Sequence, residues 1–269
     1  MAFQLTIYTL IFIAANSAVY GQNNSSNSTA GGGGGPSAAQ NGISTIFLFK
    51  CHGVLMTLTW LMLAPCAILY VRFLRDPLKR ILGDQLWFQV HRLLNTLTFI
   101  CVLIAFICAI GATGGVWKGP TIYNSWEENL AWSSIHSLFG FIAFLLTIFQ
   151  PISALFRCHP DSSARVVFNV LHAFTGYIGW LCALIAICIA CVHFGLFANT
   201  SAATVLIIVF LVLLGIVALI MQIVAIWKGH QQQQEQHGTG CIGQSQLFVI
   251  LALICCAIAV SISLLIIFA

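Results

Sequence analysis

The chain has 269 residues, of which 60% are hydrophobic and only 6% are charged, and its mean hydropathy is +1.00. Soluble domains average about 25% charged residues, so this composition excludes a soluble fold and predicts a polytopic membrane protein. The net charge of +4 comes without a basic run interleaved with aromatic residues, which argues against a nucleic-acid partner.

Residues 1–44 precede the first long apolar segment and divide into two parts. Residues 1–21 contain the short apolar run LTIYTLIFIAA and are predicted to be a signal peptide, with an uncleaved first helix as the alternative because Lys and Arg are absent. Residues 22–44 are rich in Gly, Ser and Asn, which predicts a flexible extracellular linker. N-x-S/T glycosylation signals begin at Asn23, Asn24, Asn27 and, far downstream, Asn199.

Residues 45–269 form the predicted transmembrane domain, because six apolar segments reach the roughly 20 residues that a membrane-spanning helix needs. We expect spans at about 46–71, 88–111, 132–156, 168–194, 202–227 and 245–268. The predicted fold class is therefore an all-α membrane protein with six transmembrane helices. The first four, within residues 45–195, are expected to form a central four-helix bundle, and the last two, within 200–269, to flank it.

The basic residues predict how these helices are oriented. Eight of the ten lie in or beside the first, third and fifth connections: Arg72, Arg75, Lys79, Arg80, Arg92, Arg157, Arg165 and Lys228. Loops with an excess of Lys and Arg stay in the cytoplasm, so these three connections are expected there and the N-terminus outside. The glycosylation signals agree, and the predicted location is the plasma membrane or an endomembrane vesicle with an extracellular or luminal N-terminus.

Each of the first four spans carries one histidine, near the start of its helix: His52, His91, His136 and His172. Because successive spans run antiparallel, His52 and His136 are expected near the outer face, and His91 and His172 near the cytoplasmic face. The sequence thus predicts two histidine pairs, one above the other across the membrane.

Two facing imidazoles in an apolar bundle are typical of a haem iron with two axial ligands. Zinc usually takes four ligands, and a proton relay would need carboxylates, which the four spans lack. The remaining alternative is four isolated buried histidines. Gly140 and Gly176 lie one turn after His136 and His172, and Gly53 follows His52, which leaves room for a porphyrin. The run CIACVH at 188–193 does not fit the C-x-x-C-H attachment signal, so the haem is expected to be b-type.

Four stretches resemble the cytochrome b561 family, and more narrowly its ferric-chelate reductase branch, in which the domain often follows a DOMON domain. They are HGVLMTLTW…AP (52–65), WFQVHRLLN (87–95), HSLFGFIAFLLTIFQPISALFR (136–157) and ARVVFNVLHAFTGYIGW (164–180). The resemblance covers roughly residues 45–230, and the chain departs from that branch in lacking a DOMON domain. It implies two b-type haems, with His52 and His136 as axial ligands of the outer iron and His91 and His172 of the inner iron.

The resemblance also implies transmembrane electron transfer from cytosolic ascorbate to ferric chelate or monodehydroascorbate on the far side, which is an oxidoreductase (ferrireductase) activity. A cytosolic donor site is expected among five cations near the inner haem: Arg72, Arg75, Lys79, Arg80 and Arg157. The alternatives are a non-enzymatic membrane protein and a haem redox sensor without substrate turnover. The lipid bilayer is a partner in every case, and a homodimer is compatible with the sequence.

Overall fold

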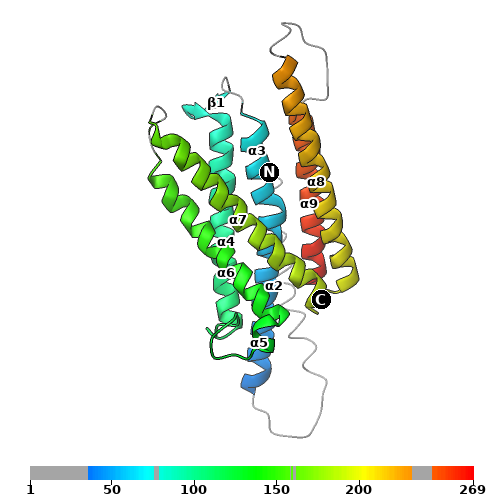
Figure 1. Ribbon diagram of the computed structural model, residues 1–269. Coiled ribbons are helices and arrows are strands. Elements are labelled where there is room, and N and C mark those ends of the chain that lie inside the picture. The colour runs from blue at the N-terminus through cyan, green and yellow to red at the C-terminus, as the bar shows by residue number, and fades with distance from the viewer. Residues whose placement is uncertain (1–35, 76–78, 158, 160–161, 232–243) are drawn as a thin grey trace.

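The computed structural model describes residues 36–75, 79–157, 159, 162–231 and 244–269, with the backbone alone at 36–43, 228–231 and 244. The predicted signal peptide, most of the predicted linker and the signals at Asn23, Asn24 and Asn27 lie outside these residues. Six helices in the described part are long and apolar enough to cross a membrane, which confirms the predicted fold class. They run side by side, and the connections between them alternate between the two ends of the molecule (Figure 1).

The helix bounds agree with the predicted spans to within a few residues, apart from the start of the first. The first span is a continuous rod of α2 (Pro36–Leu58), η1 (Thr59–Leu63) and α3 (Ala64–Phe73). The next three are α4 (Leu86–Ala112), α6 (Trp132–Leu155) and α7 (Ala164–His193), and the last two are α8 (Thr200–Gln231) and α9 (Gln244–Ile267). Because α2 begins at Pro36, it includes the last residues of the predicted linker.

The first four spans form a bundle in which α2 packs on α4, α4 on α6, and α6 on α7, while α7 closes the ring against η1. The diagonals of this bundle therefore join α2 to α6 and α4 to α7. Figure 1 shows α8 and α9 together along one flank of the bundle, as predicted from their lack of histidines.

A π-helical turn, η1, interrupts the first span near its middle. The N–H of Ala64 donates to the carbonyl of Thr59, five residues earlier. The next residue is Pro65, which has no N–H to offer the carbonyl of Trp60. That carbonyl instead accepts a hydrogen bond from the indole Nε1 of Trp180 on α7, at 3.1 Å. The π turn thus faces a partner on the neighbouring helix.

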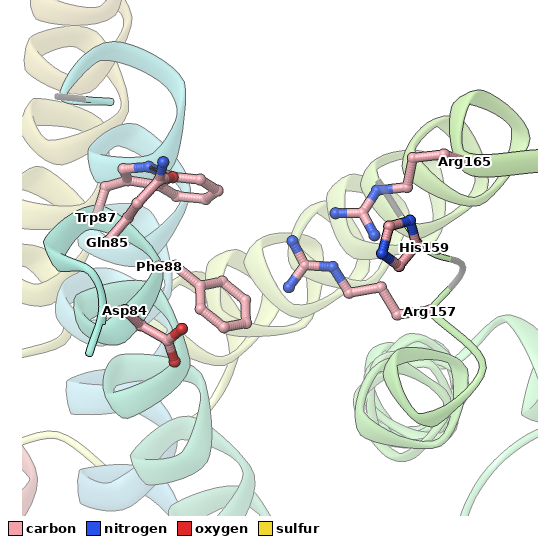
Figure 2. A pocket seen from close by; sticks show the side chains of 7 residues that line it. All are labelled: Asp84, Gln85, Trp87, Phe88, Arg157, His159 and Arg165. Atoms are coloured by element: carbon pink, nitrogen blue, oxygen red, sulfur yellow. Dashed lines mark hydrogen bonds between the residues drawn. The ribbon is translucent and has the colours of Figure 1, made fainter. Parts of the chain in front are cut away.

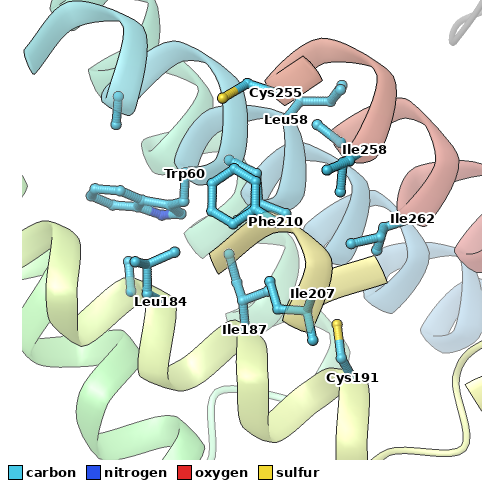
Figure 3. Packing of buried hydrophobic residues seen from close by; sticks show 14 of the residues in the cluster. Leu58, Trp60, Leu184, Ile187, Cys191, Ile207, Phe210, Cys255, Ile258 and Ile262 are labelled. Atoms are coloured by element: carbon cyan, nitrogen blue, oxygen red, sulfur yellow. The ribbon is translucent and has the colours of Figure 1, made fainter. Parts of the chain in front are cut away.

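A large part of the buried apolar core lies between the bundle and the flanking pair. Figure 3 shows side chains of the first span and α7 meeting those of α8 and α9. Ile207, Phe210 and Ile262 are each at most 1% exposed there. The four-helix bundle itself keeps an internal cavity, described below.

Two connections contain short elements that the sequence did not predict. A hairpin of β1 (Arg80–Ile81) and β2 (Asp84–Gln85) turns through Leu82 and Gly83, which both have positive φ. Two positive φ values are typical of a tight hairpin turn whose usual residues are Asn and Gly. Because Leu82 stands where Asn is usual, the hairpin could not be predicted from the turn residues. At the other end, α5 (Trp126–Leu130) begins with a capping box between Ser125 and Glu128.

Candidate functional site

The four intramembrane histidines meet in two pairs, at opposite ends of the bundle. The rings of His52 on α2 and His136 on α6 have centroids 6.4 Å apart and planes at 72°. The rings of His91 on α4 and His172 on α7 have centroids 6.4 Å apart and planes at 67°. Each pair spans one diagonal of the bundle. His52 and His172 lie deeper in their helices than the expected first two turns.

The ring separation fits a single metal ion between the two imidazoles of each pair. An imidazole nitrogen binds a metal at about 2.0 Å and lies about 1.1 Å from its ring centroid, so a linear arrangement separates the centroids by about 6.2 Å. No cluster of three or more His, Cys, Asp or Glu side chains suitable for a metal occurs in the described part of the chain. The geometry therefore suits an ion whose other ligands come from a cofactor, as in haem.

We call His52 with His136 the outer pair, and His91 with His172 the inner pair, after the sides of the membrane predicted for them. At the outer pair, backbone carbonyls contact both rings. The Nδ1 of His52 is 2.9 Å from the carbonyl oxygen of Ala105 on α4, and the Nδ1 of His136 is 2.9 Å from that of Ala186 on α7. A carbonyl only accepts, so each Nδ1 carries the proton and each Nε2 keeps its lone pair. This is the tautomer that a metal ligand needs, with the ring held by its second nitrogen.

At the inner pair, one Nδ1 contacts a backbone carbonyl and the other a hydroxyl, and both distances are longer than at the outer pair. The Nδ1 of His91 is 3.2 Å from the carbonyl oxygen of Ala67 on α3. The Nδ1 of His172 is 3.4 Å from the hydroxyl of Ser153 on α6, and that hydroxyl itself donates to the carbonyl of Gln150. Each histidine is thus held by the helix that precedes or follows its own in the chain. The sequence alone does not identify these acceptors.

A cavity of about 580 Å³ surrounds the outer pair and is lined by both His52 and His136. Cofactor pockets usually occupy about 300–1,000 Å³ and are mostly apolar, which this lining also is. Gly140 lines the cavity one turn after His136, and a Cβ placed there would meet nothing within 4 Å. Gly140 therefore leaves open space beside the ring, as expected.

The same expectation was wrong for Gly176, which does not line the cavity. A Cβ at Gly176 would contact the side chain of Gln150 at 3.6 Å, so this glycine permits packing of α6 on α7. Gln150 also donates through Nε2 to the hydroxyl of Thr175 at 2.8 Å, which joins the two helices. Gly53 does line the cavity, and a Cβ there would approach Ile266 of α9, another lining residue, to 3.1 Å.

A second cavity, of about 490 Å³, opens at the end of the bundle nearer His91 and His172, and we call it the inner cavity. Figure 2 shows Arg157, Arg165 and His159 on one side, across from Asp84, Gln85, Trp87 and Phe88. The guanidinium carbon of Arg157 lies 4.4 Å from the centroid of the Phe88 ring. Partial burial, followed by repulsion from Arg165, lowers the pKa of Arg157, and Asp84 opposes this shift.

Of the five cations expected at a donor site, Arg157 lines this cavity and the other four do not. Arg72 donates to Gln222 of α8 at 3.2 Å, and the Arg75 guanidinium lies 5.0 Å from the Trp87 ring centroid. Lys79 and Arg80 belong to the β-hairpin region. The structure adds Arg165, which lay on the predicted cytoplasmic side but was not among the five.

Asn199, a predicted glycosylation site, is exposed just before α8. Its Oδ1 accepts a hydrogen bond from the N–H of Ala202 at 2.9 Å, which caps the helix. The amide nitrogen, where a glycan would attach, is not part of that hydrogen bond.

Comparison with known proteins adds to this geometry. The sequence model of the family described as eukaryotic cytochrome b561 matches residues 51–198, which include all four paired histidines. Ferric-chelate reductase 1 of Homo sapiens is 31% identical over 134 residues, 49% of this chain and 20% of that protein. Its Bos taurus counterpart is 32% identical over 133 residues, with the same two shares.

A plant protein extends the similarity beyond animals. A cytochrome b561, DM13 and DOMON domain-containing protein of Arabidopsis thaliana is 29% identical over 150 residues, 54% of this chain and 14% of that protein. The chain therefore spans about one fifth or less of the length of these curated relatives. No solved structure matches the chain at a significant level.

Proposed function

The chain belongs to the eukaryotic cytochrome b561 family, and on this premise we propose that it carries electrons across a membrane through two b-type haems. His52 and His136 would hold the outer iron, and His91 and His172 the inner iron. The family implies b-type haem, and the number of two comes from the two histidine pairs.

One observation carries the proposal: both pairs have the same ring separation of 6.4 Å, one at each end of the bundle. Four isolated buried histidines would have no reason to share the spacing of a two-ligand metal site. The Nδ1 contacts to Ala105 and Ala186 support the same assignment, because they leave Nε2 of the outer pair available.

The protein itself would hold the two haems, orient their histidine ligands and exclude oxygen from the iron. Haem iron supplies one-electron chemistry that needs neither a nucleophile nor a general base. His52 with His136, and His91 with His172, would each hold one haem iron through two imidazole nitrogens and so would leave no site on the iron for oxygen. The carbonyls and the Ser153 hydroxyl fix the ring orientations, which sets ligand basicity.

We assign the electron donor to the inner cavity and propose that it is cytosolic ascorbate. Arg157 and Arg165 provide two guanidinium groups on one wall for an anion, and Trp87 and Phe88 provide an aromatic wall opposite. The excess of basic residues at this end supports a cytoplasmic orientation.

On the far side we propose a ferric chelate as the acceptor, because the human and bovine relatives are named ferric-chelate reductases. Monodehydroascorbate is the second candidate, since it is also reduced by a single electron. The membrane is proposed to be the plasma membrane or that of an endomembrane vesicle, with the N-terminus outside.

Purified protein reconstituted into vesicles tests this function. We expect a b-type visible spectrum with about two haems per chain, reduction of the haem by ascorbate added on the side of Arg157, and formation of ferrous iron from ferric chelate trapped inside. Absence of haem would overturn the proposal and favour the alternative of a non-enzymatic membrane protein. Haem that ascorbate reduces without any trapped chelate being reduced would leave a redox sensor and overturn the reductase assignment.

A further inference from the structure

The cavity around His52 and His136, which we call the outer cavity, contains two positively charged residues that binding of a metal by the two histidines does not explain. Its lining holds two lysines, Lys50 and Lys118, and no Asp or Glu. These are also the only two basic residues of the chain assigned by sequence to the outer side. Both cations of that side therefore line one largely apolar cavity, Lys50 from a half-buried position and Lys118 from an exposed one, where they can attract an anion.

The lysines offer hydrogen-bond donors in a lining where three hydroxyl groups already donate to the backbone. Three hydroxyls that line the cavity, of Thr57, Thr113 and Ser137, donate to carbonyls of their own helices. The Nζ of Lys50 donates to the carbonyl of Ile267 at 3.2 Å. An ammonium has three N–H bonds, so Lys50 keeps two donors after this contact.

We propose that Lys50 and Lys118 bind the two propionate carboxylates of the outer haem. This inference rests on the proposed function, since it assumes a porphyrin between His52 and His136. A ferrous haem with two imidazole ligands and both propionates ionised has a net charge of −2, which two ammonium groups neutralise. The apolar lining suits the ring of the same ligand. The lysines favour the reduced state over the oxidised state, because the reduced state carries one more negative charge.

Separate and combined Lys50→Gln and Lys118→Gln variants test the proposal on purified protein. Each substitution should make the outer haem dissociate about tenfold faster, the effect of losing one charge-assisted hydrogen bond. Its midpoint potential should fall by up to about 59 mV, which corresponds to a tenfold change for one electron. Lys50→Arg and Lys118→Arg keep the charge and should restore both properties. The outer haem is identified as the one absent from His136→Ala.

Glu127→Gln provides the control, because it changes one charge on the same side of the molecule but Glu127 does not line the cavity. It should leave haem dissociation and both potentials unchanged. Unaltered haem retention and potential in the double lysine variant would overturn the proposal, as would a change confined to the KM for ferric chelate, which would assign the lysines to a soluble anion. Absence of haem from the unmodified protein would instead refute the proposed function itself.

Discussion

The indole of Trp180 donates a hydrogen bond to the backbone carbonyl of Trp60 at 3.1 Å, and so joins α7 to the π turn of the first span. Pro65 deprives that carbonyl of its partner within the helix, and no water is available in a bilayer core to replace it. The contact closes the bundle between its first and last helices.

Substitution of Trp180 by Phe keeps an aromatic ring but removes the donor. We expect the free energy of unfolding to fall by about 1–3 kcal/mol, the cost of leaving a buried carbonyl without a partner. The midpoint of thermal unfolding in detergent measures the effect. Trp126→Phe is the control, because Trp126 is 76% exposed and should be neutral. Equal midpoints for the two variants would contradict the assignment.

Substitution of a paired histidine should remove one haem and leave the other. His136→Ala and His172→Ala should each retain about one haem per chain, because each removes an axial ligand of a different iron. His52→Ala combined with His136→Ala should lose no more than either alone, since both act on one site. Haem content by the pyridine haemochrome assay gives the count.

His193→Ala is the matched control for those variants. His193 stacks on Trp132 with ring centroids 4.0 Å apart and belongs to neither pair. It should retain full haem, whereas full haem in His136→Ala or His172→Ala would refute the pairing.

Filling the space beside His136 should exclude the outer haem without disturbing the helices. Gly140→Leu places a side chain in the cavity where a Cβ now meets nothing within 4 Å. We expect about half of the haem to be lost, with unchanged helical circular dichroism. Gly215→Leu on α8 is matched to it, because a Cβ there also meets nothing within 4 Å but lies outside the cavity. Haem loss in both variants would point to a general packing defect.

Removing positive charge from the arginine wall of the inner cavity should weaken the binding of the electron donor, ascorbate. Arg157→Gln and Arg165→Gln should each raise the KM for ascorbate by roughly threefold to tenfold, since each removes one cation from a partly hydrated anion site. Added salt should raise the KM of the unmodified protein in the same direction. Arg72→Gln removes a cation at the same end that donates to Gln222 and does not line the cavity, so its KM should stay unchanged. A KM insensitive to both cavity substitutions would exclude this wall as the donor site.

The Ser153 hydroxyl offers a side-chain test of how the histidine rings are held. Ser153→Ala removes the acceptor 3.4 Å from Nδ1 of His172, which makes the ring a weaker electron donor to iron. The potential of the inner haem should therefore rise, by less than the roughly 59 mV of a tenfold change, while the outer haem keeps its value. Ser261→Ala, whose hydroxyl donates to Ala257 within α9, should shift neither potential.

Apolar length and histidine position were enough to predict the six spans and to expect two pairs, because antiparallel helices place residues of alternate spans at the same depth. The acceptors of the ring Nδ1 atoms could not be predicted. Ala67, Ala105 and Ala186 act through backbone carbonyls, which every residue possesses, so their side chains carry no signal.

Glycine spacing was informative at Gly140 and misleading at Gly176, since a helix face can turn toward a cavity or toward a neighbouring helix with the same i, i+4 pattern. Position in the sequence also did not predict which cations line the inner cavity. Arg72 and Arg75 are close to the inner pair along the chain, yet they contact Gln222 and Trp87, whereas Arg165 reaches the inner cavity from the start of α7.

The diagonal arrangement of the histidines has a consequence for assembly. One helical hairpin, from α2 to α4, supplies His52 and His91, and the other, α6 with α7, supplies His136 and His172. Any ion bound by a pair therefore crosslinks the two hairpins, and its binding free energy adds to that of their docking. Loading one site holds the hairpins at the spacing the second site requires, so occupation of one site should strengthen haem binding at the other.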